Sequence, residues 1–221
     1  MNFVLSEDQQ MLRDTAMAFA RDEMPVSRLR ELRDGGANGV DADTKGKLAE
    51  LGFFGVLVPE EFDGVGLGMV AMGQIMEAQG RTIAATPLLQ SAVLSASALI
   101  LGGSEAQKTA WLPKIASGET TLALAVDEGT HHAPLNIATE AERNGQGYTL
   151  NGAKRYVPDG HHADVFIVFI EIHGCPRRRQ MFPRRRRRRR RRRRSRAPAS
   201  SDKPVGAARP KRRPRSRLVP Y

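Results

Sequence analysis

The sequence contains little cysteine, few aromatic residues and no long uninterrupted apolar run. Cys175 is the single cysteine among 221 residues, which excludes an internal disulfide framework and fits a reducing compartment. The opening MNFVLSEDQQ lacks the basic segment of a secretory signal peptide. The longest apolar stretch, 87–103, is interrupted by Gln90 and three serines and does not fit a membrane span. We therefore expect a cytoplasmic protein without a transmembrane segment.

Acidic residues are nearly absent from one part of the chain. Residues 176–221 hold 22 lysines and arginines against the single acid Asp202, and eleven of the arginines are consecutive at 184–194. The net charge of +11 thus combines a tail of +21 with a body of −10 over residues 1–175. Charge arguments for a nucleic-acid partner therefore apply to the tail alone. The body is long enough to bury a sizeable core.

Helical periodicity dominates residues 1–119. Ser6 with Gln9, and Ser104 with Gln107, have the spacing of a capping box, in which the two side chains satisfy the first backbone groups of a helix. Proline ends the first helical pattern and glycine the second. The predicted helices run from Ser6 to Pro25, over 44–51 up to Gly52, over 69–79, over 88–101, and from Ser104 to Gly118.

The hydrophobic period changes to that of strands after Gly118. The strand-like segments are separated by Gly, Asn, Asp and Pro, and RNGQGY fits a hairpin turn. They cover 121–126, 136–143, 147–157 and 164–172. The sequence therefore predicts an α+β fold. An N-terminal all-α domain over 1–119 is followed by a partial antiparallel β-domain over 120–173 and a disordered basic tail over 174–221.

Four segments together carry a family resemblance. LSEDQQMLRDTAMAFARDEM, LGFFGVLVPEEFDGVGLG, GSEAQKTAWLPKIASGE and YTLNGAKRYVPDGHHADVFIVF resemble the acyl-CoA dehydrogenases in order and spacing, over roughly residues 3–170. The resemblance implies a helical domain, a middle β-domain and a C-terminal helical bundle, with FAD as the cofactor. It also implies removal of a hydride and a proton from an acyl-CoA substrate, with electrons passing to an electron-transferring flavoprotein.

The same resemblance places the first flavin motif of the family on Ala125, Val126 and Asp127. Little of the usual side-chain pattern survives there, but backbone amides can hydrogen-bond the isoalloxazine ring whatever side chains they carry. The serine that approaches the CoA-bearing substrate in the family is replaced by His132. The resemblance therefore implies three cofactor-binding residues and one substrate-binding residue in this segment.

The second flavin motif, usually Trp-Ile-Thr, falls on Tyr156, Val157 and Pro158. Tyr156 can replace the tryptophan as a flat wall for the ring, and Val157 continues the strand. Pro158 has neither a hydroxyl nor an N–H group, so the hydrogen bond of the usual threonine is lost.

The sequence offers no catalytic residue. In the family a glutamate from the C-terminal bundle takes the α-proton, and none of the motifs found here belongs to that bundle. The pairs His131–His132 and His161–His162 do not predict a metal site, because adjacent residues on a strand point to opposite faces. We expect the complete protein to be an oligomer of like or unlike subunits, and this truncated chain to be inactive alone. Fatty-acyl, steroid side-chain and amino-acid-derived substrates all remain open.

The arginine-rich tail has two competing explanations. It can bind nucleic acid non-specifically through counterion release, without base stacking, because no aromatic residue interleaves the arginines. It can instead be out-of-frame translation of a GC-rich coding sequence, since the family resemblance ends where the tail begins. Reading the other two frames beyond codon 170 tests this, and frames that encode no β-domain and helical bundle reject it. A further alternative for the whole chain is a non-catalytic companion subunit of a dehydrogenase.

Overall fold

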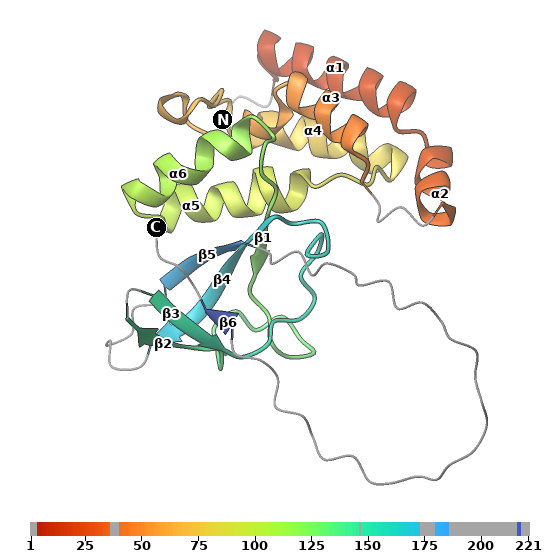
Figure 1. The fold of residues 1–221 in the computed structure, drawn as a ribbon. Coiled ribbons are helices and arrows are strands. Elements are labelled where there is room, and N and C mark those ends of the chain that lie inside the picture. The colour runs from red at the N-terminus through yellow and green to blue at the C-terminus, as the bar shows by residue number, and fades with distance from the viewer. Residues whose placement is uncertain (1–3, 36–39, 146, 173–179, 186–215, 218–221) are drawn as a thin grey trace, which may run out of the picture.

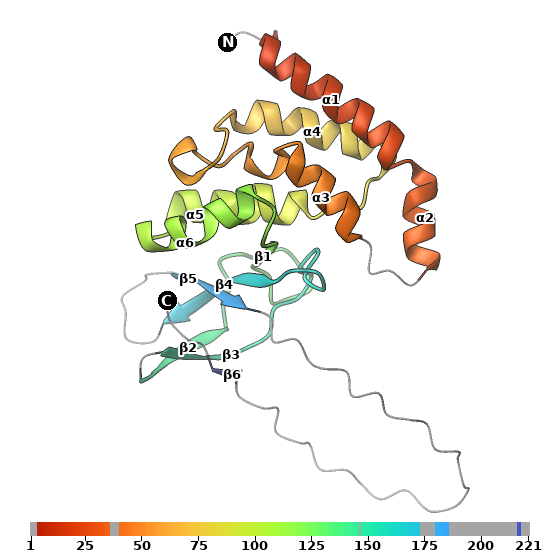
Figure 2. The same ribbon diagram turned by 45° about the horizontal axis from the view of Figure 1, so that its top comes forward.

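The computed structural model describes residues 4–35, 40–145, 147–172, 180–185 and 216–217. A layer of helices lies on one side of a small sheet (Figure 1). In Figure 2 helix α1 (Glu7–Glu23) is farthest from the sheet, while α5 (Ala96–Gly102) and α6 (Glu105–Ala116) lie next to it. The predicted α+β class, with a helical domain before a partial sheet, is confirmed.

Both predicted capping boxes are present. The Ser6 hydroxyl accepts from the Gln9 N–H at 3.2 Å, and the Gln9 side chain accepts from the Ser6 N–H at 3.1 Å. Ser104 and Gln107 make the same two bonds at 3.3 and 3.0 Å. The other helical elements of the described residues are α2 (Val26–Asp34), α3 (Ala42–Glu50), η1 (Phe53–Gly55), η2 (Glu60–Phe62), α4 (Gly68–Thr82) and η3 (Leu89–Ser95).

Helix α2 is not predicted by the sequence. Pro25 does end α1, but at φ −64° it also occupies the N-cap of α2, and this fixed φ suits the entry to a helix. Val26, Leu29 and Leu32 do recur every three residues, but Leu32 is the one buried residue of this nine-residue helix. Gly52, at φ 71°, has the expected left-handed conformation after α3.

The sheet is mixed rather than antiparallel. Strands β2 and β3 form the predicted hairpin, whereas β4 runs parallel to both β1 and β2. The antiparallel prediction was wrong here because the chain makes a long excursion after β1 and enters β4 in the same direction, which a parallel pair requires. The bounds are β1 (Leu122–Ala125), β2 (Glu140–Asn144), β3 (Gly147–Asn151) and β4 (Val165–Ile172).

Two short strands lie within the segment predicted as a disordered tail. Strand β5 (Gln180–Arg185) pairs antiparallel with β4, and β6 (Ser216–Arg217) pairs with β3. The prediction is corrected at these positions, because a sheet edge presents backbone N–H and C=O groups that an extended segment of almost any sequence can pair. The rest of the predicted tail, with its proposed nucleic-acid binding, lies outside the described residues.

The helical layer and the sheet share a core. Trp111 and Leu112 of α6 pack in one buried cluster with Leu122 of β1 and with Val165 and Ile167 of β4. This cluster crosses the boundary predicted between residues 119 and 120, so the position of β1 depends on the helices. Among the described residues, no helix combines the length and the apolar character that a membrane span requires.

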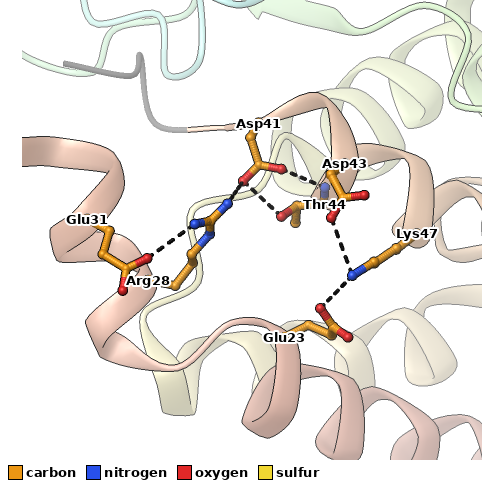
Figure 3. Close-up of polar contacts among 7 residues, drawn as sticks. All are labelled: Glu23, Arg28, Glu31, Asp41, Asp43, Thr44 and Lys47. Atoms are coloured by element: carbon orange, nitrogen blue, oxygen red, sulfur yellow. Dashed lines mark hydrogen bonds and ion pairs between the residues drawn. The ribbon is translucent and has the colours of Figure 1, made fainter. Parts of the chain in front are cut away.

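A network of ion pairs joins the ends of α1, α2 and α3 (Figure 3). The Arg28 guanidinium donates to Glu31 at 3.2 Å and to Asp41 at 3.0 Å. Asp41 is the N-cap of α3, and its carboxylate also accepts from the Thr44 N–H at 2.7 Å and from the Thr44 hydroxyl at 3.1 Å. One carboxylate therefore caps α3 and ties it to α2.

Replacing Asp41 with alanine is expected to lower the free energy of unfolding by about 1 kcal/mol, the usual value of an N-cap. Burial pushes the pKa of Asp41 up, but the bonds from Thr44 and Arg28 hold it below its ordinary 3.8. The contribution is therefore present above about pH 4 and is lost as the pH falls further. Urea unfolding of both proteins at about pH 7 and about pH 3 measures the difference.

Asp43→Ala is the matched control for Asp41. The Asp43 carboxylate is 76% exposed and contacts Lys47 at 3.3 Å on the same helix. An exposed pair of this kind contributes about 0.5 kcal/mol or less. Equal destabilisation by the two substitutions would contradict the capping role of Asp41.

Candidate functional site

The two segments predicted to contact a flavin lie side by side. The first follows β1 and the second follows β3. The Lys154 ammonium donates to the Val126 carbonyl at 2.9 Å, across 28 residues of sequence. The Arg155 N–H donates to the Asp127 carbonyl at 2.8 Å. Tertiary structure thus brings together the two motifs that the sequence separates.

The helical layer sets the position of the first segment. Ser91 Oγ accepts from the Leu122 N–H at 3.2 Å, and Gln90 Oε1 accepts from the Leu124 N–H at 3.0 Å. Because successive N–H groups of a strand point to opposite sides, the N–H of Ala125 faces β4. Ala125 is 3% exposed and belongs to the buried cluster of the sheet. The next two residues are therefore the candidate donors to a flavin.

The donor set at this point fits a flavin ring. Within the described residues, the backbone N–H groups of Val126 and Asp127 donate no hydrogen bond. Lys154 holds the Val126 carbonyl and thereby fixes the peptide unit that carries the Asp127 N–H, and Arg155 holds the Asp127 carbonyl of the next unit. An isoalloxazine ring presents carbonyl and ring-nitrogen acceptors along one edge, and two adjacent N–H donors suit such an edge.

His132 lies in the exposed loop that follows these donors. Its Nδ1 is 3.0 Å from the Asp127 carboxylate, which also accepts from the Ala133 N–H at 3.0 Å. The bond from His132, and after it the bond from the Ala133 N–H, hold the pKa of Asp127 below its ordinary value. The His132 side chain is 75% exposed. It is therefore accessible to a ligand and is anchored to the candidate donor segment, and its substrate contact stays a prediction.

Glu128 and Lys154 form a largely buried ion pair that the sequence pattern does not reveal. Their side chains are 14% and 8% exposed, and the ammonium lies 2.7 Å from Glu128 Oε1. The Glu128 carboxylate also accepts from the N–H groups of Ala138 at 2.8 Å and Thr139 at 3.0 Å. Lys154 lies two residues before the second motif, in the segment Gly152-Ala153-Lys154, and this proximity is the one sequence signal that points to it. Nothing comparable marks Glu128, because its partners come from elsewhere in the chain.

Glu128 is expected to make stability depend on acid pH. Burial alone would raise the pKa of its carboxyl, but the bonds from Lys154, Thr139 and Ala138 lower it from 4.5 to about 2. Its contribution is therefore full above about pH 5 and is lost between about pH 4.5 and 2.

Unfolding curves across this pH range should show Glu128→Gln about 2 kcal/mol less stable than the unchanged protein near neutral pH, with the gap closing on acidification. A gap that does not change with pH would show that the carboxylate charge contributes nothing.

Tyr156 is held in an unusual backbone conformation. Its φ is 50°, in the left-handed region, and the residue is 70% exposed. This conformation costs a non-glycine residue about 1 kcal/mol, so neighbouring contacts must impose it. Arg155 is bonded to Asp127, and Val157 packs in the cluster of Ala125. The Tyr156 side chain is thus exposed, and it belongs to the residue that follows the backbone bond between Arg155 and Asp127.

Pro158 is exposed and, lacking an N–H, offers a cofactor no backbone donor. A turn follows it, which contains His161 and His162. The prediction that these two histidines lie on a strand, with their side chains on opposite faces, was wrong. The rings of His161 and His162 lie 4.0 Å apart, because the residues are in a turn and not on a strand. In the described part of the chain, no group of three or more His, Cys, Asp or Glu side chains could hold a metal ion.

A helical layer over a small mixed sheet, with free backbone donors after the first strand, defines an α+β protein with a candidate ligand site at the end of that strand. The chain belongs to the acyl-CoA dehydrogenase family, since the family model described as "Acyl-CoA dehydrogenase, N-terminal domain" matches residues 6–119.

Curated relatives agree with this assignment. Isovaleryl-CoA dehydrogenase, mitochondrial, from Pongo abelii is 33% identical over 168 residues, which make up 75% of this chain and 40% of that protein. Very long-chain specific acyl-CoA dehydrogenase, mitochondrial, from Macaca fascicularis is 37% identical over 155 residues, 66% of this chain and 24% of that protein. The chain therefore spans less than half the length of these relatives.

Solved structures show the same fold. The ChsE4-ChsE5 complex from Mycobacterium tuberculosis has a TM-score of 0.71 at 29% identity, covering 83% of this chain and 48% of that chain. The acyl-CoA dehydrogenase from Bacillus anthracis has a TM-score of 0.65 at 28% identity, covering 82% of this chain and 31% of that chain. The latter is complexed with FAD, the cofactor of this family.

Proposed function

We propose that this chain forms part of an FAD-dependent acyl-CoA dehydrogenase, which oxidises the Cα–Cβ bond of an acyl-CoA thioester. The observation that carries the proposal is the junction of the two motif segments in a chain of this family. There Lys154 and Arg155 hold the carbonyl groups of Val126 and Asp127, and two N–H donors remain for a ligand. FAD, when bound, supplies the acceptor for the hydride.

Each candidate residue has a proposed task. The N–H groups of Val126 and Asp127 would bind the polar edge of the flavin, and the Tyr156 ring would lie against its face. Val157 would fix the Tyr156 segment on the sheet through its packing with Ala125. His132, anchored by Asp127, would contact the CoA-bearing substrate.

We assign the role of catalytic base to none of the described residues. We propose an electron-transferring flavoprotein as the electron acceptor and an oligomer of like or unlike subunits as the assembly. Fatty-acyl, steroid side-chain and amino-acid-derived thioesters are the candidate substrates.

FAD binding by the purified full chain tests this proposal. The chain should retain or take up FAD, seen as the visible flavin absorbance, and its thermal unfolding temperature should rise with FAD concentration. Tyr156→Ala should weaken FAD affinity about tenfold, since a stacked aromatic ring contributes about 1 kcal/mol beyond its buried area.

Leu101→Ala is the matched control, because Leu101 is 87% exposed on α5 in the helical layer. Its affinity for FAD should equal that of the unchanged protein. A colourless chain that FAD does not stabilise would refute the proposed cofactor binding.

A second candidate function is a non-catalytic companion subunit of a dehydrogenase. The likeness to the ChsE4-ChsE5 complex, an assembly of two differently named proteins, supports it. Co-expression with a full-length acyl-CoA dehydrogenase of the same genome should then yield a stoichiometric complex. A chain that stays monomeric beside every such partner would argue against it.

A further inference from the structure

The Lys154–Glu128 pair differs from the other ion pairs of the protein. Among the ion pairs between described residues, it is the one in which both side chains are less than 20% exposed. A buried pair is costly to desolvate and often stabilises a fold no better than apolar side chains would. Stability by itself therefore does not explain why two charges are placed here, and positioning of the backbone is a further role for the pair.

The contacts of the pair close the loop between β1 and β2. Lys154 binds the Val126 carbonyl at the beginning of this loop, at 2.9 Å. Glu128 binds the N–H groups of Ala138 and Thr139 at its end, at 2.8 and 3.0 Å. The ammonium and the carboxylate then join these two ends at 2.7 Å. Three stretches of chain thus meet at one pair of charges.

The Val126 carbonyl belongs to the same peptide unit as the Asp127 N–H. Because this unit is planar, the bond from Lys154 to the carbonyl also fixes the direction of that N–H. On this geometry we infer that Lys154 and Glu128 are positioning residues, which aim the Asp127 N–H toward the flavin edge without touching the cofactor. The inference rests on the proposed function, since it assumes FAD as the ligand of these donors.

The test compares Lys154→Met and Lys154→Arg in the full chain. FAD dissociation constants, the visible circular dichroism of bound flavin, and amide hydrogen exchange without FAD are measured for each. Lys154→Met should weaken FAD binding about tenfold or more, alter the flavin dichroism, and speed exchange at Ala138 and Thr139. Lys154→Arg, which keeps the charge, should restore the dichroism and slow the exchange again.

A Lys154→Met protein can fail to fold, because it leaves the Glu128 carboxylate buried without its cation. The double variant Glu128→Gln with Lys154→Met removes both charges and keeps similar side-chain volumes. It should fold, yet it should bind FAD about tenfold more weakly than the unchanged protein and show altered dichroism. Lys108→Met, which breaks the exposed pair with Glu105, should change none of these readouts.

The outcomes separate this inference from the proposed function. A folded double variant with unchanged FAD affinity and dichroism overturns the positioning role while the proposed function stands. An unchanged protein that binds no FAD overturns the proposed function and, with it, the flavin-directed part of the inference. Exchange at Ala138 and Thr139 that does not respond to Lys154→Met overturns the claim that the pair fixes the loop, whether or not FAD binds.

Discussion

Replacing Gly64 with alanine is expected to lower the free energy of unfolding by about 3 kcal/mol or more, enough to deplete the folded protein at physiological temperature. A Cβ added at Gly64 would overlap the backbone carbonyl of Val58. That backbone cannot move aside freely, because the Val58 carbonyl accepts from the Gly66 N–H at 2.9 Å and Gly64 itself donates to Pro59 at 3.1 Å.

The loop around Gly64 therefore depends on the close approach of two backbone segments. Val58 is fully buried in the core that α6 shares with the sheet, so a shift of its carbonyl would be transmitted to that core. Urea or thermal unfolding followed by far-UV circular dichroism measures the loss.

Gly46→Ala is the control for Gly64→Ala. Gly46 lies inside α3, where an added Cβ would meet nothing within 4 Å. Because alanine is the better helix former, this substitution should stabilise the protein by about 0.5–1 kcal/mol. If the two alanine variants changed stability in the same direction, the close-approach argument would be rejected.

Gln90 and Ser91 of η3 both bind β1. The double variant Gln90→Met with Ser91→Ala is expected to lower the free energy of unfolding by about 3 kcal/mol. These side chains accept from the N–H groups of Leu124 and Leu122, at 3.0 and 3.2 Å. Without them one buried and one part-buried donor lose their partners, and each such loss costs about 1–3 kcal/mol. FAD affinity should fall as well, since β1 leads directly into the Val126 segment.

Ser95→Ala is a closely matched control for Ser91→Ala. Both serines are 0% exposed and belong to the same π-helical element, but within the described residues the Ser95 hydroxyl has no hydrogen-bond partner. Its removal should be neutral or slightly stabilising. If Ser91→Ala and Ser95→Ala lowered the free energy of unfolding by the same amount, the bond from Ser91 to β1 would contribute nothing to stability.

The elements with local signals were predictable. The serine and glutamine of each capping box are three residues apart, and Gly52 and the hairpin after Asn144 depend only on neighbouring backbone conformations. Elements without such signals were missed. Helix α2 has one buried residue, and η3 is a π-helix within a segment whose composition reads as an ordinary helix.

In the candidate site, too, some residues were located from the sequence and others were not. The resemblance located the segments of Val126 and Tyr156, but it assigned no role to Glu128. It also counted Ala125 as a donor, whereas the alternation along β1 turns that N–H toward β4. Strand direction likewise follows from how the chain returns to the sheet, which no local pattern encodes.

The sequence by itself determined the family, the order of helices before strands, and the helix boundaries that capping residues mark, because each depends on residues close together in the chain. Tertiary structure alone decided the parallel pairing of β1 with β4, the support of β1 by Gln90 and Ser91, and the burial of Lys154 with Glu128. The three side-chain contacts among these features join residues that are 26 to 34 positions apart in the sequence. Such contacts form only when packing of the shared core brings the segments within hydrogen-bonding distance.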